Sequence, residues 1–188
     1  MLDRRDFVRQ LLIDRGDLLV VSGLGSATYD TAAAGDHPLN FYLWGAMGGT
    51  AMIGLGLALA QPERRVAVLT GDGDMLMGLG SLATIGVKQP KNLAIVVLDN
   101  AHYGETGMQA SHTKAGIDLV AVALGCRFKH ARVISRIEEA ADVRKLLHAG
   151  EGPILVSARI SEEDVPRVLP IRDGHAIKQR FIAALNGA

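Results

Sequence analysis

The fold of this chain is decided by residues 71–100, which read GDGDMLMGLGSLATIGVKQPKNLAIVVLDN. The apolar run Val66–Thr70 leads into this stretch, and a second apolar run, Leu93–Leu98, comes just before its end. Each run predicts a buried strand of a parallel sheet. The residues between them predict one helix, Met75–Val87, so the stretch is expected to form a strand, a helix and a strand in that order.

Two side chains in this stretch suit a site for a metal ion and a diphosphate. Asp72 lies on the glycine-rich turn after the first strand, and Asn100 follows the second strand. Open α/β sheets bind ligands at the carboxyl ends of their strands, so the two side chains are expected to meet there. The glycines let backbone N–H groups approach phosphates closely, and carboxylate and amide oxygens are ligands that Mg²⁺ accepts. We therefore predict that Asp72 and Asn100 hold a Mg²⁺ bound to a diphosphate.

The same stretch resembles the thiamine-diphosphate motif, which opens with GDG and closes with Asn. The similarity continues upstream in Gly45-Ala46-Met47-Gly48-Gly49 and downstream in the residues His102–Gln109. Together these segments resemble the diphosphate-binding half of the sulfopyruvate and phosphonopyruvate decarboxylases. The resemblance extends from about Leu18 to Ser157 and implies a thiamine-diphosphate-binding fold of the diphosphate (PP) type.

The resemblance also implies thiamine diphosphate and Mg²⁺ as cofactors and assigns residues to them. Asp72, Asn100 and the backbone carbonyl of His102 would bind the metal ion. The residues implied to contact thiamine diphosphate are Gly45, Ala46, Met47, Gly71, Asp72, Gly73, Asp74, Asn100, His102, Tyr103 and Gly104. The Met47 side chain would support the cofactor in its bent conformation. The implied catalytic residues are Met47, His102, Glu105 and His112.

Residues 101–114, which we call the site loop, are predicted to contact the substrate or to close over it. The candidates are Glu105, Thr106, Gln109, His112 and Thr113, and the alternative interpretation is that they are ordinary loop residues. The related enzymes tend to have Pro and Thr after the loop Gln, whereas this chain has Ala110 and Ser111, which leaves the substrate open. A sulfonate or phosphonate tail needs cationic or N–H donors, and Lys114 and His112 are the nearby cations.

A partner chain is expected because the chemistry of this family needs a catalytic Glu from a separate pyrimidine-binding domain. The first Glu in this sequence is Glu63, and fewer than 50 residues precede Gly45. We therefore expect residues 1–188 to form a single PP-type domain, with the pyrimidine domain on an α subunit and an α2β2 or larger assembly. The predicted function is the β subunit of a 2-oxo acid decarboxylase that releases CO₂ and an aldehyde. A split carboligase of the acetolactate-synthase kind and a non-catalytic cofactor-binding subunit remain as alternatives.

Composition and patterning exclude several other classes of protein. The 188 residues carry a formal net charge of zero, which does not indicate a nucleic-acid-binding surface. The single cysteine, Cys126, excludes an internal disulfide framework, and no apolar run reaches the length of a membrane span. The segment Gly23–Thr28 lacks the third glycine of a dinucleotide fingerprint, and the histidines do not show metal-finger spacing. The cytoplasm is the expected location.

The remaining segments predict alternating strands and helices, which favours an α/β fold of three layers, a parallel sheet with helices on both faces. The other expected helices are 3–13, 50–60, 117–124, 135–148 and 175–185, and the other expected strands are 17–22, 127–132 and 154–159. Residues 23–38 are expected to form a loop with a short helix, and residues 161–174 an irregular segment.

Overall fold

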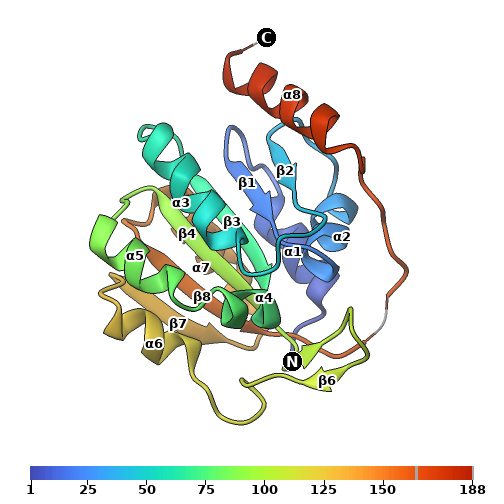
Figure 1. Cartoon of the computed structure of the whole chain (residues 1–188), viewed down its shortest axis with the longest axis vertical. Coiled ribbons are helices and arrows are strands. Elements are labelled where there is room, and N and C mark those ends of the chain that lie inside the picture. Colours follow the sequence, from blue (N-terminus) through green and yellow to red (C-terminus); the bar gives the residue numbers. More distant parts are fainter. Residues whose placement is uncertain (164, 188) are drawn as a thin grey trace.

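The computed structural model describes residues 1–163 and 165–187, and its centre is a sheet of parallel strands (Figure 1). The strands are β1 Leu19–Ser22, β2 Asn40–Tyr42, β3 Val66–Gly71, β4 Leu93–Asp99, β7 His130–Ile134 and β8 Ile154–Arg159. Their order across the sheet is β2, β1, β3, β4, β8 and β7, and each neighbouring pair is parallel. The predicted parallel sheet is confirmed, with β3 and β4 side by side at its centre.

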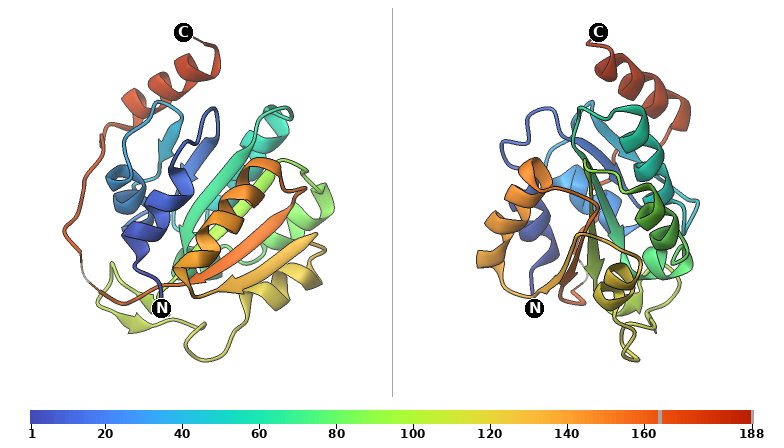
Figure 2. Two further views of the ribbon diagram at one scale, coloured as in Figure 1. Left: turned by 180° about the vertical axis from the view of Figure 1, so that it is seen from behind. Right: turned by 90° about the vertical axis from the view of Figure 1, so that its left-hand side faces the viewer.

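Helices cover both faces of the sheet, as the side view shows (Figure 2). One face carries α1 Arg4–Leu12, α2 Ser26–Ala33 and α7 Ala140–Ala149; the other carries α3 Thr50–Ala60, α4 Asp72–Met77, α5 Ser81–Lys88 and α6 Leu119–Gly125. Alternate side chains of a strand point to opposite faces. In β4, Leu93 and Ile95 therefore pack against the α3 side, while Ala94 and Val96 pack against the α1 side. This burial on both faces explains the uninterrupted apolar runs in the sequence and confirms the three layers.

The single helix predicted at residues 75–87 is wrong, because the structure has two helices, α4 and α5, in its place. The break falls at Gly78, where the chain passes against Gly48. A Cβ on Gly78 would lie 2.2 Å from the carbonyl oxygen of Gly48, so only glycine permits this approach. The break thus places the segment 45–49 against the end of α4.

Several other boundaries differ from the sequence-based expectation. The short strand β2 was not expected, and β7 begins at His130 instead of Arg127. The segment 135–148 is a 3₁₀ turn, Ile137–Glu139, followed by α7. The site loop contains a small antiparallel hairpin of β5 His102–Tyr103 and β6 Gln109–Ala110. The hairpin therefore gives the site loop a defined base.

The C-terminal part of the chain runs from β8 along the outside of the molecule to α8 Gly174–Leu185, beside β2 (Figures 1 and 2). Phe41 and Phe181 pack there edge to face with ring centroids 5.5 Å apart, and Arg180 forms an ion pair of 2.6 Å with Asp36. In the described part of the chain, no helix is long and apolar enough to cross a membrane.

Candidate active site

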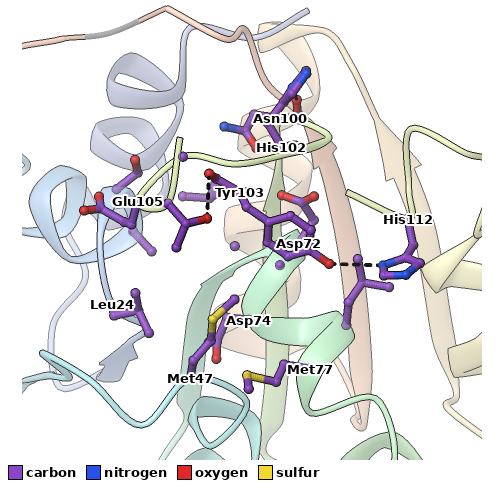
Figure 3. A pocket seen from close by; sticks show the side chains of 18 of the residues that line it. Leu24, Met47, Asp72, Asp74, Met77, Asn100, His102, Tyr103, Glu105 and His112 are labelled. Atoms are coloured by element: carbon purple, nitrogen blue, oxygen red, sulfur yellow. Dashed lines mark hydrogen bonds between the residues drawn. The ribbon is translucent and has the colours of Figure 1, made fainter. Parts of the chain in front are cut away.

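A cavity of about 680 Å³ opens at the carboxyl ends of the central strands (Figure 3). The predicted site residues that line it are Met47, Gly71, Asp72, Gly73, Asp74, Asn100, His102, Tyr103, Gly104, Glu105 and His112. Among the described residues, Gly45 and Ala46 lie outside the lining, on the turn that carries Met47. The structure therefore brings the predicted cofactor, metal and catalytic residues together around one cavity.

Asp72, which the sequence predicts as a metal ligand, is a buried acidic group in the cavity lining. It follows β3 directly, and its side chain is almost fully enclosed. Its Oδ2 accepts hydrogen bonds from the Ser111 hydroxyl and, at 3.3 Å, from Thr113 Oγ1. Burial raises the pKa of Asp72, the nearby Asp99 raises it further, and the hydroxyl hydrogen bonds oppose both effects. A cation beside Asp72 would relieve this cost of holding a buried negative charge.

Asn100 directly follows β4, and His102 begins β5 two residues later. Asn100 Oδ1 accepts a hydrogen bond of 3.0 Å from the backbone N–H of His102. The His102 ring has Nε2 at 2.8 Å from Lys114 Nζ and Nδ1 at 2.8 Å from the Asn100 carbonyl. An ammonium group only donates, so Nε2 accepts from Lys114 and Nδ1 donates to the carbonyl. These bonds hold the His102 ring at the base of the site loop and also engage Lys114.

Asp74 has a different role from Asp72, although only one residue separates them. Its carboxylate accepts hydrogen bonds from the Gly48 N–H and from the hydroxyls of Thr50 and Thr70. Its side chain therefore ties together the 45–49 turn, the start of α3 and the end of β3. A Cβ on Gly23 would lie 2.7 Å from Asp74 Oδ2, so the end of β1 also presses against this group. The Asp74 side chain positions the backbone around the cavity.

Met47 and Tyr103 enclose the glycine of the turn after β3. The segment that carries Met47 needs left-handed backbone at Ala46, with φ of +56°, and at Gly48, with φ of +89°. A Cβ on Gly73 would lie 2.6 Å from the Tyr103 ring and 3.3 Å from the Met47 methyl group. Gly73 is buried between these two side chains and lines the cavity with backbone, and the absence of a Cβ there is what close approach by a phosphate requires.

The site loop contributes Tyr103, Glu105 and His112 to the cavity lining. The Tyr103 hydroxyl is 3.0 Å from His112 Nδ1, and the two rings meet edge to face (Figure 3). Glu105 contacts Gly25, where a Cβ would lie 2.8 Å from its side chain, and its Oε2 is 3.9 Å from Arg167 Nη2. The site loop therefore brings a phenol, an imidazole and a carboxylate to the cavity; we call this part of the lining the loop wall.

The other loop candidates divide into those at the cavity and those away from it. Thr106 lines the cavity, whereas Gln109 is exposed and bonds to Thr106. Thr113 is buried behind Asp72, beside Ser111. Thr113 thus contacts Asp72 and, among the described residues, is not part of the cavity lining.

Sequence reasoning missed part of the lining. The segment at the N-terminal end of α2 contributes Leu24, Ser26 and Ala27, and other parts of the chain contribute further apolar lining residues: Leu76, Met77, Leu79, Leu98, Ile117 and Ile160. The glycines at 23 and 25 directly after a strand were the available signal for α2. The contact of Ser111 with Asp72 had no local signal, because 39 residues separate the two.

Comparison with known proteins decides the family. The model of the thiamine pyrophosphate enzyme C-terminal TPP binding domain matches residues 23–158, which include the cavity residues described above except Ile160. The chain belongs to the thiamine pyrophosphate enzyme family. Thiamine pyrophosphate is another name for thiamine diphosphate, so the predicted family and fold class are confirmed.

Individual members of the thiamine pyrophosphate enzyme family show how the chain relates to whole enzymes. It is 39% identical to the sulfopyruvate decarboxylase subunit beta of Methanothermobacter thermautotrophicus, covering 100% of this chain and 98% of that one. It is 40% identical to the phosphonopyruvate decarboxylase of Streptomyces viridochromogenes, over 77% of this chain and 36% of that enzyme. A Rhodococcus jostii thiamine diphosphate-dependent 4-hydroxybenzoylformate decarboxylase superposes with a TM-score of 0.70 and 21% identity, covering 87% of this chain and 33% of that one. This last likeness shows the shared fold.

Proposed function

We propose that this chain is the β subunit of a 2-oxo acid decarboxylase that depends on thiamine diphosphate and Mg²⁺. The proposed substrate has an anionic tail, as sulfopyruvate and phosphonopyruvate do, and the products are CO₂ and an aldehyde. One observation carries the proposal: the buried Asp72, the backbone of Gly73 and the neighbouring Asn100 line one cavity at the carboxyl ends of β3 and β4. The match to a β subunit over the full length of both chains supports the division into subunits.

The residues around Asp72 and Asn100 fit a site for Mg²⁺ and thiamine diphosphate together. Asp72, Asn100 and the His102 carbonyl would supply oxygen ligands to Mg²⁺, and the diphosphate would supply others. In the described residues, no group of three or more His, Cys, Asp or Glu side chains could bind a metal ion. The backbone at Gly71, Gly73 and Asp74 would face the diphosphate at the start of α4, while Gly45, Ala46 and Met47 would contact the aminopyrimidine.

The protein would contribute binding, orientation and exclusion of water. Bound thiamine diphosphate supplies a carbon nucleophile and accepts the electron pair that remains when CO₂ leaves. The apolar wall around Leu76 and Leu79 would keep water from the reacting carboxylate. Glu105 and the Tyr103–His112 pair are the groups at the loop wall that can hold or transfer a proton.

We also propose that an α subunit completes the site. It would supply the pyrimidine-binding domain and its catalytic Glu, in an α2β2 or larger assembly. Met47 and Met77 line the cavity and are 37% and 67% exposed, so they offer apolar surface for a partner to cover. Lys114 is engaged by His102, which favours a partner residue as the cation for the substrate tail.

Product analysis of the assembled enzyme tests this function. The chain would be co-purified with its partner and incubated with sulfopyruvate, phosphonopyruvate or pyruvate, with and without thiamine diphosphate and Mg²⁺. The expected result is CO₂ and the matching aldehyde from an anionic-tail substrate, only when both cofactors are present. Acetolactate from pyruvate as the main product would instead identify a carboligase. A cofactor-loaded complex that releases no CO₂ from these substrates would contradict the proposed decarboxylase.

A further inference from the structure

We propose that Ser111 and Thr113 are positioning residues that set the metal affinity of the site by fixing the Asp72 carboxylate. This inference rests on the proposed function, because it concerns the same metal site. In this proposal the base of the site loop, and not the turn after β3 alone, determines how well Asp72 binds the cation.

The two hydroxyls form a compact bridge between two buried carboxylates. Ser111 Oγ donates to Asp72 Oδ2, and Thr113 Oγ1 lies 2.9 Å from Ser111 Oγ and 2.8 Å from Asp99 Oδ1. All four side chains are buried, with exposures between 1% and 6%. Among the described residues, hydroxyl donors reach Oδ2 of Asp72, so its Oδ1 is the oxygen left for a cation. The bridge therefore selects the orientation of the carboxylate.

The hydroxyl protons show which of Ser111 and Thr113 matters more for the Asp72 carboxylate. Each hydroxyl has one proton to donate. The Ser111 proton goes to Asp72, while Thr113 has three acceptors within reach: Asp99 at 2.8 Å, Ser111 at 2.9 Å and Asp72 at 3.3 Å. Asp72 receives the Ser111 proton whichever acceptor Thr113 uses. Loss of the Ser111 hydroxyl should thus weaken metal binding more than loss of the Thr113 hydroxyl.

Charge pairing explains why the bridge directs a cation to Asp72 and not to Asp99. Arg159 Nη1 lies 2.5 Å from Asp99 Oδ2, and the backbone N–H of Ala101 lies 3.0 Å from Asp99 Oδ1. Asp99 is therefore already paired with a positive charge. The described groups that donate to the Asp72 carboxylate are two hydroxyls and its own backbone N–H, all uncharged, so they leave its charge in place.

The position of Ser111 couples this bridge to the site loop. Ser111 follows β6 directly, and its N–H donates to the Ala101 carbonyl at 2.8 Å, which closes the base of the loop. The same hairpin pairs Ala110 with His102, whose carbonyl is the proposed third metal ligand from this chain. One hairpin thus carries both a proposed ligand and the group that orients Asp72.

Mn²⁺ binding to the assembled complex tests the inference without relying on turnover. Mn²⁺ would replace Mg²⁺, and free Mn²⁺ would be measured by electron paramagnetic resonance in the presence of thiamine diphosphate. Loss of an outer partner of a metal ligand typically weakens affinity about 10- to 100-fold, and we expect Ser111→Ala to fall in this range. Thr113→Val should weaken binding less, and Thr113→Ser should restore it. At saturating Mg²⁺, the kcat of Ser111→Ala should approach that of the wild type, whereas its activation constant for Mg²⁺ should stay raised.

Ser157→Ala is the matched control. Its hydroxyl is buried and lies 3.4 Å from Asp99, but it belongs to β8 and its recorded contact is with Asp99. Its Mn²⁺ affinity should equal that of the wild type. If Ser111→Ala does not assemble, Ser111→Cys keeps a weaker donor of similar size and should bind Mn²⁺ with reduced affinity.

The outcomes separate the two proposals. Wild-type affinity in Ser111→Ala, together with lost affinity in Asp72→Ala, would overturn the positioning role and leave the proposed metal site intact. A wild-type complex that binds no Mn²⁺ with thiamine diphosphate would overturn both. Equal weakening by Ser157→Ala would also overturn the inference, because the effect would then be a general response to a lost buried hydroxyl.

Discussion

The glycine turn (residues 71–74, the last residue of β3 and the first turn of α4) and the tip of the site loop (residues 104–110) border the same cavity but are held in very different ways. The turn is bonded to distant segments: Asp74 accepts from Gly48 and Thr50, and Asp72 accepts from Ser111. The loop tip is exposed, and side chains such as Thr106 bond to near neighbours. The part of the cavity at residues 71–74 is therefore held by contacts with other elements of the fold, whereas the exposed tip has hydrogen bonds within the site loop itself.

The largest effect is expected for the metal ligand of the turn. Asp72→Ala removes a charged ligand, so affinity for Mg²⁺ in the presence of thiamine diphosphate should fall by at least about 100-fold. Isothermal titration of the assembled complex would measure this loss. Asp142→Ala, which removes an exposed carboxylate paired with Lys145, is the control and should bind normally. Unchanged affinity in Asp72→Ala would show that the cation binds elsewhere.

The next effect concerns the stability of the turn. Asp74→Ala would leave one backbone N–H and two hydroxyls without their acceptor, at a cost of about 3 kcal/mol in the free energy of unfolding. Asp74→Asn keeps one acceptor oxygen and should lose less. Urea denaturation would measure both variants. If Asp74→Ala were as stable as the wild type, the turn would not be the rigid part of the site.

A smaller effect on the free energy of unfolding is expected from ionisation of Asp72 when the metal is absent. Its pKa is raised from 3.8 by burial, so the folded state holds this proton more tightly than the unfolded state. Stability from this group is therefore fully present below pH 3.8 and is lost as the pH rises through the raised pKa. Burial also raises the pKa of Asp30, so denaturation at several pH values in a chelator should show a decline in both proteins that is steeper in the wild type than in Asp72→Asn. Identical pH profiles for the two proteins would contradict the assignment.

The smallest effect is expected at the loop wall. Tyr103→Phe removes the hydrogen bond between two exposed groups, Tyr103 and His112, and should change the free energy of unfolding by less than about 0.5 kcal/mol. Thermal and urea unfolding would measure it, with Asp74→Ala as the reference. A loss as large as that of Asp74→Ala would show that the Tyr103–His112 side of the site loop is held as firmly as the turn.

The parts of the structure that the sequence could predict depend on local pattern. The strands around Asp72 and Asn100 follow from uninterrupted apolar runs, and parallel pairing then brings the two side chains to one edge of the sheet. The split between α4 and α5 depends on Gly48, which is distant in sequence from Gly78. The acceptor role of Asp74 and the donor role of Ser111 likewise arise from long-range contacts, so residue type and spacing could not show them.

Native mass spectrometry tests the central claim most directly, namely that this chain supplies the metal and diphosphate half of a shared site. The chain would be purified from its own host with Mg²⁺ and thiamine diphosphate present. The expected result is a complex with a second chain that retains the mass of thiamine diphosphate and Mg²⁺. A homo-oligomer that carries neither cofactor and no second chain would contradict the account.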